Sequence, residues 1–221
     1  MYDKTIIYYT SNRENPKFEA KIRNNILKQK GNLPIINVSQ KPINFGNNIC
    51  VGDVGHSYLN EFRQILIGAK KAETEYLVFT ESDFLYPQNY FSFEPKGANI
   101  YRYNNVWILF KNPRLYSYRR KNHSVGAQIG KRDYIIKLLE EHLEGAPEWF
   151  DGEIQPKDKN GVYKKDVFTV PFELFGSNIP CVSFKTGQGM RKFTNVLHGR
   201  SNLSMKLPYW GHAGNLRKEY F

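Results

Sequence analysis

The sequence predicts a mixed α/β fold, with a mostly parallel sheet flanked by helices and a smaller α+β half after it. Segments rich in β-branched and aromatic residues alternate with segments whose apolar residues recur every three or four positions. Loops rich in glycine and asparagine separate them. Alternating strands and helices favour right-handed crossovers, because parallel strands cannot be joined by a tight turn.

The first strand is expected at residues 4–10 (KTIIYYT), which are rich in β-branched and aromatic side chains. A helix follows to about residue 30, with Asn15 as its N-cap and Pro16 in its first turn. Phe18, Ile22 and Ile26 recur every four residues and are expected to face the core. This unit predicts a crossover to a second, parallel strand.

The second strand is expected at residues 33–39 (LPIINVS). A loop rich in glycine and asparagine (NFGNNICVGDVGHS) then leads to a second helix from about Ser57, and the strand EYLVF comes after it. Parallel strands place a ligand site beyond their carboxyl ends. The residues that follow EYLVF are therefore expected at such a site.

The second half of the chain is expected to mix strands and helices. The alternating segment NIYRYNNVWILF predicts a hairpin that turns at Asn104-Asn105, and RLYSYRR adds a further strand. One helix is expected at residues 131–144, closed by Gly145 and Pro147. No linker divides the sequence, so one domain is predicted over residues 1–221, with halves at about 1–110 and 111–221.

The composition is that of a globular protein. The chain of 221 residues is long enough to bury a core without disulfides, and 40% of it is hydrophobic. No apolar run approaches the roughly 18 residues that span a bilayer, and no signal segment begins the sequence. Cys50 and Cys181 have no metal or redox spacing. These features predict a soluble, cytoplasmic protein without a membrane partner.

The net charge is +11, and such a field attracts polyanions, either the phosphates of a nucleotide or a nucleic acid backbone. The alternative is a basic surface with no such partner. In YSYRRKNHS, residues 116–124, aromatic residues are interleaved with cations, as they are on nucleic-acid surfaces. The excess of positive charge is greatest near the C-terminus. Residues 185–221 contain one acid, Glu219, and seven basic residues, Lys185, Arg191, Lys192, Arg200, Lys206, Arg217 and Lys218.

Two carboxylates, Glu81 and Asp83, follow the expected strand EYLVF directly. Set one residue apart where the chain turns, both can reach one hard divalent cation, or one can bind the cation and the other a sugar hydroxyl. Mg²⁺ and Mn²⁺ typically take one or two carboxylates together with phosphate oxygens. The alternative is an acidic turn with no ligand.

This order of elements, ending in Glu81-Ser82-Asp83, resembles the nucleotide-sugar-binding half of glycosyltransferases of the GT-A fold, a Rossmann-like fold whose Asp-x-Asp element binds the metal of a sugar nucleotide. Here Glu81 replaces the first Asp. The wider pattern, from VSQKPINFG to TESDFLYP with LHGRSN and LPYWG near the C-terminus, is similar to small phage and metagenomic glycosyltransferase-like proteins. A phage-encoded protein would act in the host cytoplasm.

The resemblance implies roles for particular residues. Asp83 would be a metal ligand, Glu81 a metal or ribose contact, and Thr10 and Ser11 would lie beside the nucleotide base or ribose. Many members of the family have an acidic pair after the second strand, where this chain has VSQKP. The base of the donor is therefore not assigned.

The family usually supplies a third metal ligand, commonly a histidine, from its C-terminal part. His198 is the better match, because Gly199 lets the backbone approach the diphosphate while Arg200 and Lys206 could hold it. His212 in YWGHAG is the alternative.

An inverting transfer needs a carboxylate that takes the proton from the attacking hydroxyl. The segment EWFDGE offers Asp151 first and Glu153 next, whereas a retaining enzyme would need neither.

The sequence and the resemblance together predict a hexosyltransferase-type enzyme that uses Mn²⁺ or Mg²⁺ and a nucleoside diphosphate sugar. The basic charge and the resemblance favour DNA carrying a hydroxymethylated base as the acceptor. The alternatives are a saccharide acceptor or a nucleic-acid-binding module that lacks catalysis. A nucleotidyltransferase usually has a glycine-rich loop after its first strand, and YYTSNRENP has no glycine there.

Overall fold

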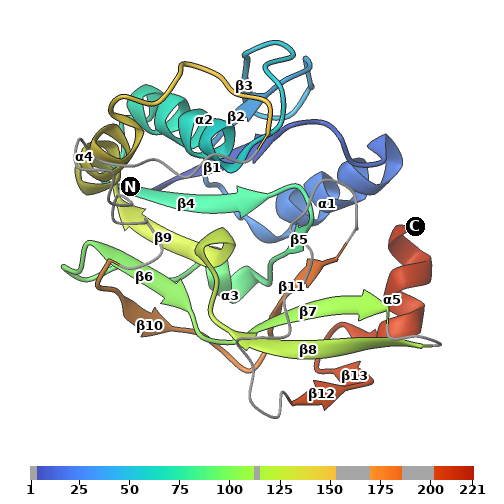
Figure 1. Cartoon of the computed structure of the whole chain (residues 1–221). Coiled ribbons are helices and arrows are strands. Elements are labelled where there is room, and N and C mark those ends of the chain that lie inside the picture. The colour runs from blue at the N-terminus through green and yellow to red at the C-terminus, as the bar shows by residue number, and fades with distance from the viewer. Residues whose placement is uncertain (1–3, 112–114, 153–169, 186–201) are drawn as a thin grey trace.

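A computed structural model describes residues 4–111, 115–152, 170–185 and 202–221, in which two sheets lie beside one another (Figure 1). The first sheet has the strand order β10-β6-β9-β4-β1-β2-β3. Its strands are β1 (Lys4–Thr10), β2 (Ile35–Ser39), β3 (Asn47–Cys50), β4 (Tyr76–Glu81), β6 (Ile100–Tyr103), β9 (Gln128–Lys131) and β10 (Glu173–Phe175).

The second sheet has the order β12-β8-β7-β11-β5, and β13 pairs with β14 in a separate two-stranded ladder. The strands of the second sheet are mostly antiparallel, except that β7 and β11 run parallel. These strands are β5 (Phe84–Leu85), β7 (Val106–Lys111), β8 (Tyr116–Asn122), β11 (Cys181–Phe184), β12 (Leu203–Ser204), β13 (Lys206–Leu207) and β14 (Gly211–His212).

The core of the first sheet is parallel. β1 lies between β2 and β4, parallel to both, and β3 continues the parallel arrangement on the far side of β2. β9 runs antiparallel between β4 and β6. The expected mixed α/β fold with a mostly parallel sheet flanked by helices is confirmed.

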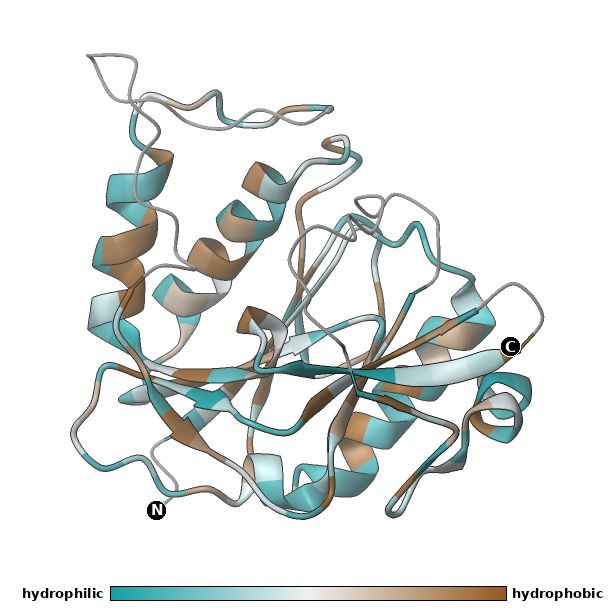
Figure 2. Cartoon of the chain, turned by 60° about the horizontal axis from the view of Figure 1, so that its bottom comes forward, coloured by the Kyte–Doolittle hydropathy of each residue, from teal (hydrophilic) through white to brown (hydrophobic). Residues whose placement is uncertain are grey.

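Helices cover both faces of the first sheet. α2 (Tyr58–Lys71) and α4 (Arg132–Leu143) pack with Ile7 and Tyr9 on one face. α1 (Pro16–Gln29) and the second sheet pack with Ile6 and Tyr8 on the other. Hydrophobic residues are concentrated along the strands and on parts of the helices, as Figure 2 shows. The remaining helices are α3 (Gln88–Phe91), the 3₁₀ turn η1 (Val125–Ala127) and α5 (Ala213–Tyr220).

Most elements expected in the first hundred residues are present, and their caps explain where the helices begin. Asn15 accepts hydrogen bonds from the backbone N–H groups of Lys17 and Phe18, with Pro16 at the first helical position. Ser57 caps α2 by accepting from Asn60 N. β3 is not expected from its sequence NNIC, because a short, partly exposed edge strand lacks the apolar pattern of a buried one.

The expected hairpin at Asn104-Asn105 is wrong. β6 pairs with β9 and β10 in the first sheet, whereas β7 pairs with β8 and β11 in the second, so the chain crosses between sheets at this asparagine pair. Asn105 Nδ2 donates to Ser177 O (3.0 Å) and Asn105 Oδ1 accepts from Trp107 Nε1 (2.9 Å). These bonds hold the crossing in place of a turn. The strand predicted from RLYSYRR and the helix predicted at 131–144 correspond to β8 and α4.

The division predicted near residue 110 does not coincide with the two sheets. β5 precedes that residue and β7 contains it, and both belong to the second sheet, whereas β9 and β10 follow it and belong to the first. Within the described residues, no helix is long and apolar enough to cross a bilayer.

Candidate active site

A cleft with a volume of about 370 Å³ opens at the carboxyl ends of β1 and β4. This edge is where an open parallel sheet places its ligand. The first sheet contributes the residues that follow β1 and β4, and the start of α2 lies along the same cleft. The second sheet contributes the end of β8 and the residues after β11. The cleft is therefore built where the two sheets meet.

Glu81 is the last residue of β4 and lines the cleft. Its carboxylate Oε1 accepts a hydrogen bond from the Tyr9 hydroxyl at 3.0 Å. Its backbone N–H donates to the Tyr86 hydroxyl at 2.9 Å, and this hydroxyl donates to Gly126 O at 2.6 Å. Burial raises the pKa of Glu81, and Lys121 and the Tyr9 hydrogen bond oppose that rise. Hydrogen bonds to two tyrosines therefore fix both the side chain and the backbone of Glu81.

Gly126 leaves the space that the Glu81 carboxylate occupies. A Cβ atom at this position would lie 2.4 Å from Glu81 Oε1 and 2.5 Å from Oε2, closer than any real contact. Gly126 is in η1, on the segment that leads into β9. The antiparallel strand β9 beside β4 therefore brings a glycine against the acid.

Asp83 lies in the turn between β4 and β5, and its side chain is buried. Its backbone carbonyl accepts from Phe184 N at 2.8 Å, which fixes the turn against β11. Among the described residues, Asp83 Oδ2 has no hydrogen-bond partner. Burial raises the pKa of Asp83 well above its usual value, and the charges of Glu81 and Glu14 raise it further, against the effect of Lys121.

Two lysines of the second sheet face the acids. Lys121, near the end of β8, lines the cleft, and its Nζ donates to Ser124 Oγ at 2.9 Å. Lys185 follows β11 and also lines the cleft. Burial lowers the pKa of Lys185, the charge of Asp83 opposes this, and Lys121 adds to it. One wall of the cleft is therefore acidic and the other basic.

The acid pair fits a divalent cation. A buried carboxylate oxygen without a partner, next to a second carboxylate, is costly in the metal-free protein, and a cation would neutralise both. Oxygen ligands of this kind suit Mg²⁺ and Mn²⁺, which complete their coordination with water and phosphate. No group of three or more His, Cys, Asp or Glu side chains that could hold a metal occurs within the described ranges.

The raised pKa of Asp83 predicts an unusual dependence of stability on pH. A buried acid with a raised pKa binds its proton more tightly in the folded than in the unfolded state. Its stabilising effect is complete below about pH 3.9, the pKa of an unfolded Asp, and is lost as pH rises through the folded pKa. We expect the free energy of unfolding of the metal-free protein to fall, relative to that of Asp83→Asn, as the pH rises above about 3.9.

Urea unfolding of both proteins in chelator at several pH values measures this difference. Parallel pH curves for the two proteins would contradict the expectation, and added Mn²⁺ should reduce the loss in the unsubstituted protein alone.

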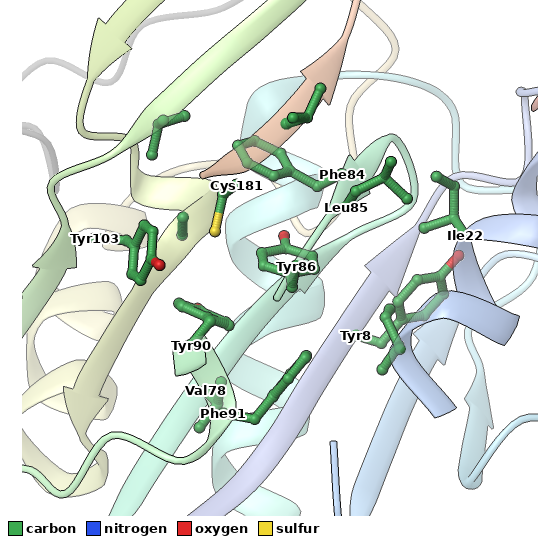
Figure 3. Packing of buried hydrophobic residues seen from close by; sticks show 14 of the residues in the cluster. Tyr8, Ile22, Val78, Phe84, Leu85, Tyr86, Tyr90, Phe91, Tyr103 and Cys181 are labelled. Atoms are coloured by element: carbon green, nitrogen blue, oxygen red, sulfur yellow. The ribbon is translucent and has the colours of Figure 1, made fainter. Parts of the chain in front are cut away.

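Tyr86 joins β4 to η1 and predicts a second stability effect. Its ring is buried, stacked on Phe84 and Tyr90 (Figure 3). Tyr86→Phe keeps that packing but leaves Glu81 N–H and Gly126 C=O without their partner. We expect it to lower the free energy of unfolding by about 2–3 kcal/mol, measured by urea denaturation. The exposed Tyr209→Phe, which removes only a surface bond to Gln29, should cost less than about 0.5 kcal/mol.

Thr10, the last residue of β1, and Ser11, which follows it, both line the cleft. Thr10 is buried, and its hydroxyl donates to Glu19 (3.0 Å) while accepting from Asn12 N (2.9 Å). Gln64 Nε2 donates to Thr10 O (2.9 Å), which ties the end of β1 to α2. Thr10 therefore shapes the loop through its side chain, and Ser11 is the partly exposed member of the pair.

Asp151 lies on a segment bonded to the loop before α2. Its Oδ1 accepts from His56 N (2.7 Å) and lies 3.6 Å from Arg13 Nη2. Asn60 exchanges two further hydrogen bonds with the backbone of Phe150, at 2.7 and 3.0 Å. Asp151 is exposed and is not among the residues that line the cleft. Its contacts indicate a role in fastening this segment.

Asp151→Asn separates that role from general-base catalysis, because an amide oxygen can still accept from His56 N while the basic carboxylate is lost. We expect the reaction carried out at the cleft to stay within about threefold of the unsubstituted rate in a steady-state assay. A general base would cost about 100- to 10,000-fold, and a loss of that size would show that Asp151 takes the proton.

Lys206 and His212 lie outside the cleft. They face one another in the β13–β14 ladder, both exposed, and His212 Nδ1 accepts from Gly214 N (3.2 Å) to cap α5. The structure does not bring either residue to the acid pair. Glu153, His198 and Arg200, the other predicted site residues, lie outside the described residues.

Several residues that line the cleft or support Glu81 are not found by reading the sequence for chemistry. Gly126, Tyr86 and Tyr9 carry no local signal, and Lys185 appears only within a count of C-terminal charge. Lys121 is noticed as part of a basic segment, but its place opposite the acids depends on the pairing of the second sheet.

Comparison with protein-family models and with curated proteins finds no match. Solved structures do match. A structure of S. aureus TarS 1–349 in complex with UDP-GlcNAc is 14% identical and has a TM-score of 0.42, and the match covers 86% of this chain and 59% of that one. A glycosyltransferase involved in the glycosylation of the major capsid of PBCV-1 is 12% identical at a TM-score of 0.46, covering 81% and 92%.

An inositol-1-phosphate CTP transferase from T. maritima also matches, at 13% identity and a TM-score of 0.48, covering 86% of this chain and 92% of that one. This chain spans about half the length of two further matches, 52% of the bifunctional IspDF from Campylobacter jejuni and 51% of S. aureus TarS 1–349. At these identities and TM-scores the matches assign neither a reaction nor a substrate to this chain.

Proposed function

We propose that this chain is a glycosyltransferase that uses Mn²⁺ or Mg²⁺ and transfers a sugar from a nucleoside diphosphate sugar to an acceptor hydroxyl. The observation that carries the proposal is the buried Asp83 carboxylate, which lies beside Glu81 and opposite two lysines and has one oxygen without a hydrogen-bond partner in the described part of the chain. A cation at the acids and a diphosphate between the walls would balance these charges.

Each described residue has a proposed part. Asp83 and Glu81 would hold the cation, which supplies positive charge to the departing diphosphate. Lys121 and Lys185 would bind its phosphate oxygens from the opposite wall. Ser11 would lie beside the ribose or base, on a loop shaped by Thr10. The acids, their cation and the lysines would hold the diphosphate in position before its bond to the sugar breaks.

Predicted residues outside the described ranges keep their proposed roles. His198 stays the proposed third metal ligand and Arg200 a proposed phosphate contact. Glu153 stays the proposed base for an inverting transfer, since Asp151 is bonded to the loop before α2.

The donor site is tested by thermal unfolding with a panel of nucleoside diphosphate sugars, with and without Mn²⁺. A ligand that binds only the folded state adds about 2.7 kcal/mol to the free energy of unfolding when its concentration is a hundred times its Kd, and the melting temperature rises as a result. We expect a shift that needs both Mn²⁺ and a nucleotide sugar and is lost in Asp83→Asn. No shift with any donor at millimolar concentration would refute the proposed function.

The proposed acceptor is a hydroxymethylated base in DNA. The net charge of +11 supports a polyanionic acceptor, and a base inside a duplex would have to be extruded to reach the cleft. Radiolabelled sugar transfer to hydroxymethylated and to unmodified DNA tests it. Transfer to neutral saccharides alone would indicate a saccharide acceptor, and DNA binding without donor turnover would indicate a non-catalytic module.

A further inference from the structure

The β8 strand joins the cleft to a basic surface. Lys121 at its end lines the cleft, and Arg120 is exposed next to it. At the other end, Tyr116 is paired with the exposed Lys111 of β7, and Arg217 of α5 lies over the Tyr116 ring at 5.6 Å. Seven residues of extended chain span about 20 Å, so exposed cations lie near both ends of the strand, and one of these ends is at the cleft.

The charge on this surface is not used by ion pairs within the described part of the chain. The six ion pairs found there join residues of the first sheet, its helices and their loops. None of them involves Lys111, Arg120, Lys121 or the exposed Lys206 of β13. The sequence from Pro95 to Arg132 contains no Asp or Glu, so β7 and β8 carry no acid of their own. Among the described residues, Lys111, Arg120 and Lys206 therefore form no ion pair that would compete with an external anion.

Two apolar side chains lie on the strands next to β8, each paired with one of its arginines. Trp107, partly exposed on β7, faces Arg120 across the strand pair. Leu203, 56% exposed on the edge strand β12, pairs with Arg119. A groove that binds single-stranded nucleic acid combines cations for the phosphates with aromatic side chains on which bases stack, and Trp107 is an aromatic residue of this kind. A bilayer surface could not follow the row into the cleft, where Lys121 lies.

We propose that the surface formed by Lys111, Arg120, Lys121 and Lys206 binds a single strand of nucleic acid along β8 and leads it into the cleft. This inference rests on the proposed function in one respect: the bound strand would serve as the acceptor. Binding itself is measured without donor or metal, so its failure and that of the glycosyltransferase proposal are separate results.

The test uses fluorescence anisotropy of a labelled 20-nucleotide single-stranded DNA at several salt concentrations. Lys111→Gln, Arg120→Gln and Lys206→Gln are combined in one variant, and Lys121 is left intact because it lines the cleft. The control variant combines Lys17→Gln, Lys28→Gln and Lys71→Gln, which are exposed lysines around the first sheet. Both variants remove three positive charges, so overall charge is matched.

We expect the β8 variant to lose at least tenfold in affinity at about 100 mM salt and to lower the slope of log K against log salt by about 2. The control should stay within about twofold. Equal losses in the two variants, or no binding of the DNA, would overturn the proposal. So would binding to vesicles of phosphatidylglycerol in place of DNA. The donor-dependent thermal shift should be unchanged in the β8 variant.

Discussion

Asp83→Asn is expected to reduce metal-dependent cleavage of the donor sugar by about 1,000-fold or more, a loss of about 4 kcal/mol of transition-state stabilisation. The asparagine keeps the size of the side chain and the backbone bond from Phe184 N to residue 83, so the turn should persist. It removes the buried charge that would hold the cation. Donor hydrolysis over a range of Mn²⁺ concentrations measures the effect.

Asp53→Asn is the matched control, because Asp53 is an exposed acid that does not line the cleft. It should hydrolyse the donor at the unsubstituted rate. Circular dichroism should show both variants folded, and Asp83→Asn in chelator should be at least as stable as the unsubstituted protein at pH 8. Full activity in a folded Asp83→Asn protein would refute the metal site.

Gly126→Ala is expected to lower kcat/KM by about 100-fold and stability by about 1–3 kcal/mol. The new methyl group would occupy the place of the Glu81 carboxylate, which must leave its bond with Tyr9. Glu81 would then no longer lie beside Asp83. Steady-state kinetics with varied Mn²⁺ should show a higher metal requirement as well as the lower rate.

Gly214→Ala is the control for this substitution. A Cβ at Gly214 would meet His212 Nδ1 at 3.4 Å, an ordinary contact. It should leave kcat/KM unchanged, and an equal loss in both alanine variants would show that Gly126 has no special role at the acid.

The sequence predicts the parallel part of the fold because its signals are local. Asn15 and Ser57 cap their helices, and the buried strands are continuous apolar runs. The hairpin prediction fails because alternating apolar and polar residues indicate two strands but not which strands they pair with. β6 and β7 pair with different strands and not with each other. Here the chain crosses between the sheets, and Asn105 is held there by a hydrogen bond to Ser177, which lies far along the chain.

The same contrast holds at the site. Glu81 and Asp83 can be placed at the cleft from the sequence because Glu81 ends β4 and Asp83 lies in the turn after it. Gly126 reaches Glu81 through β9, which inserts antiparallel next to β4, and Lys121 reaches the acids through the pairing of β8. These contacts depend on which strands are neighbours in the sheets, and no local sequence pattern specifies the order of the strands.

The cleft takes its acids from the first sheet and its lysines from the second. Substitutions on β8 away from Lys121 can therefore change the proposed acceptor surface while β4 and its acids stay intact. In the proposed enzyme, acceptor choice could in this way vary during evolution without loss of the residues proposed to bind the donor.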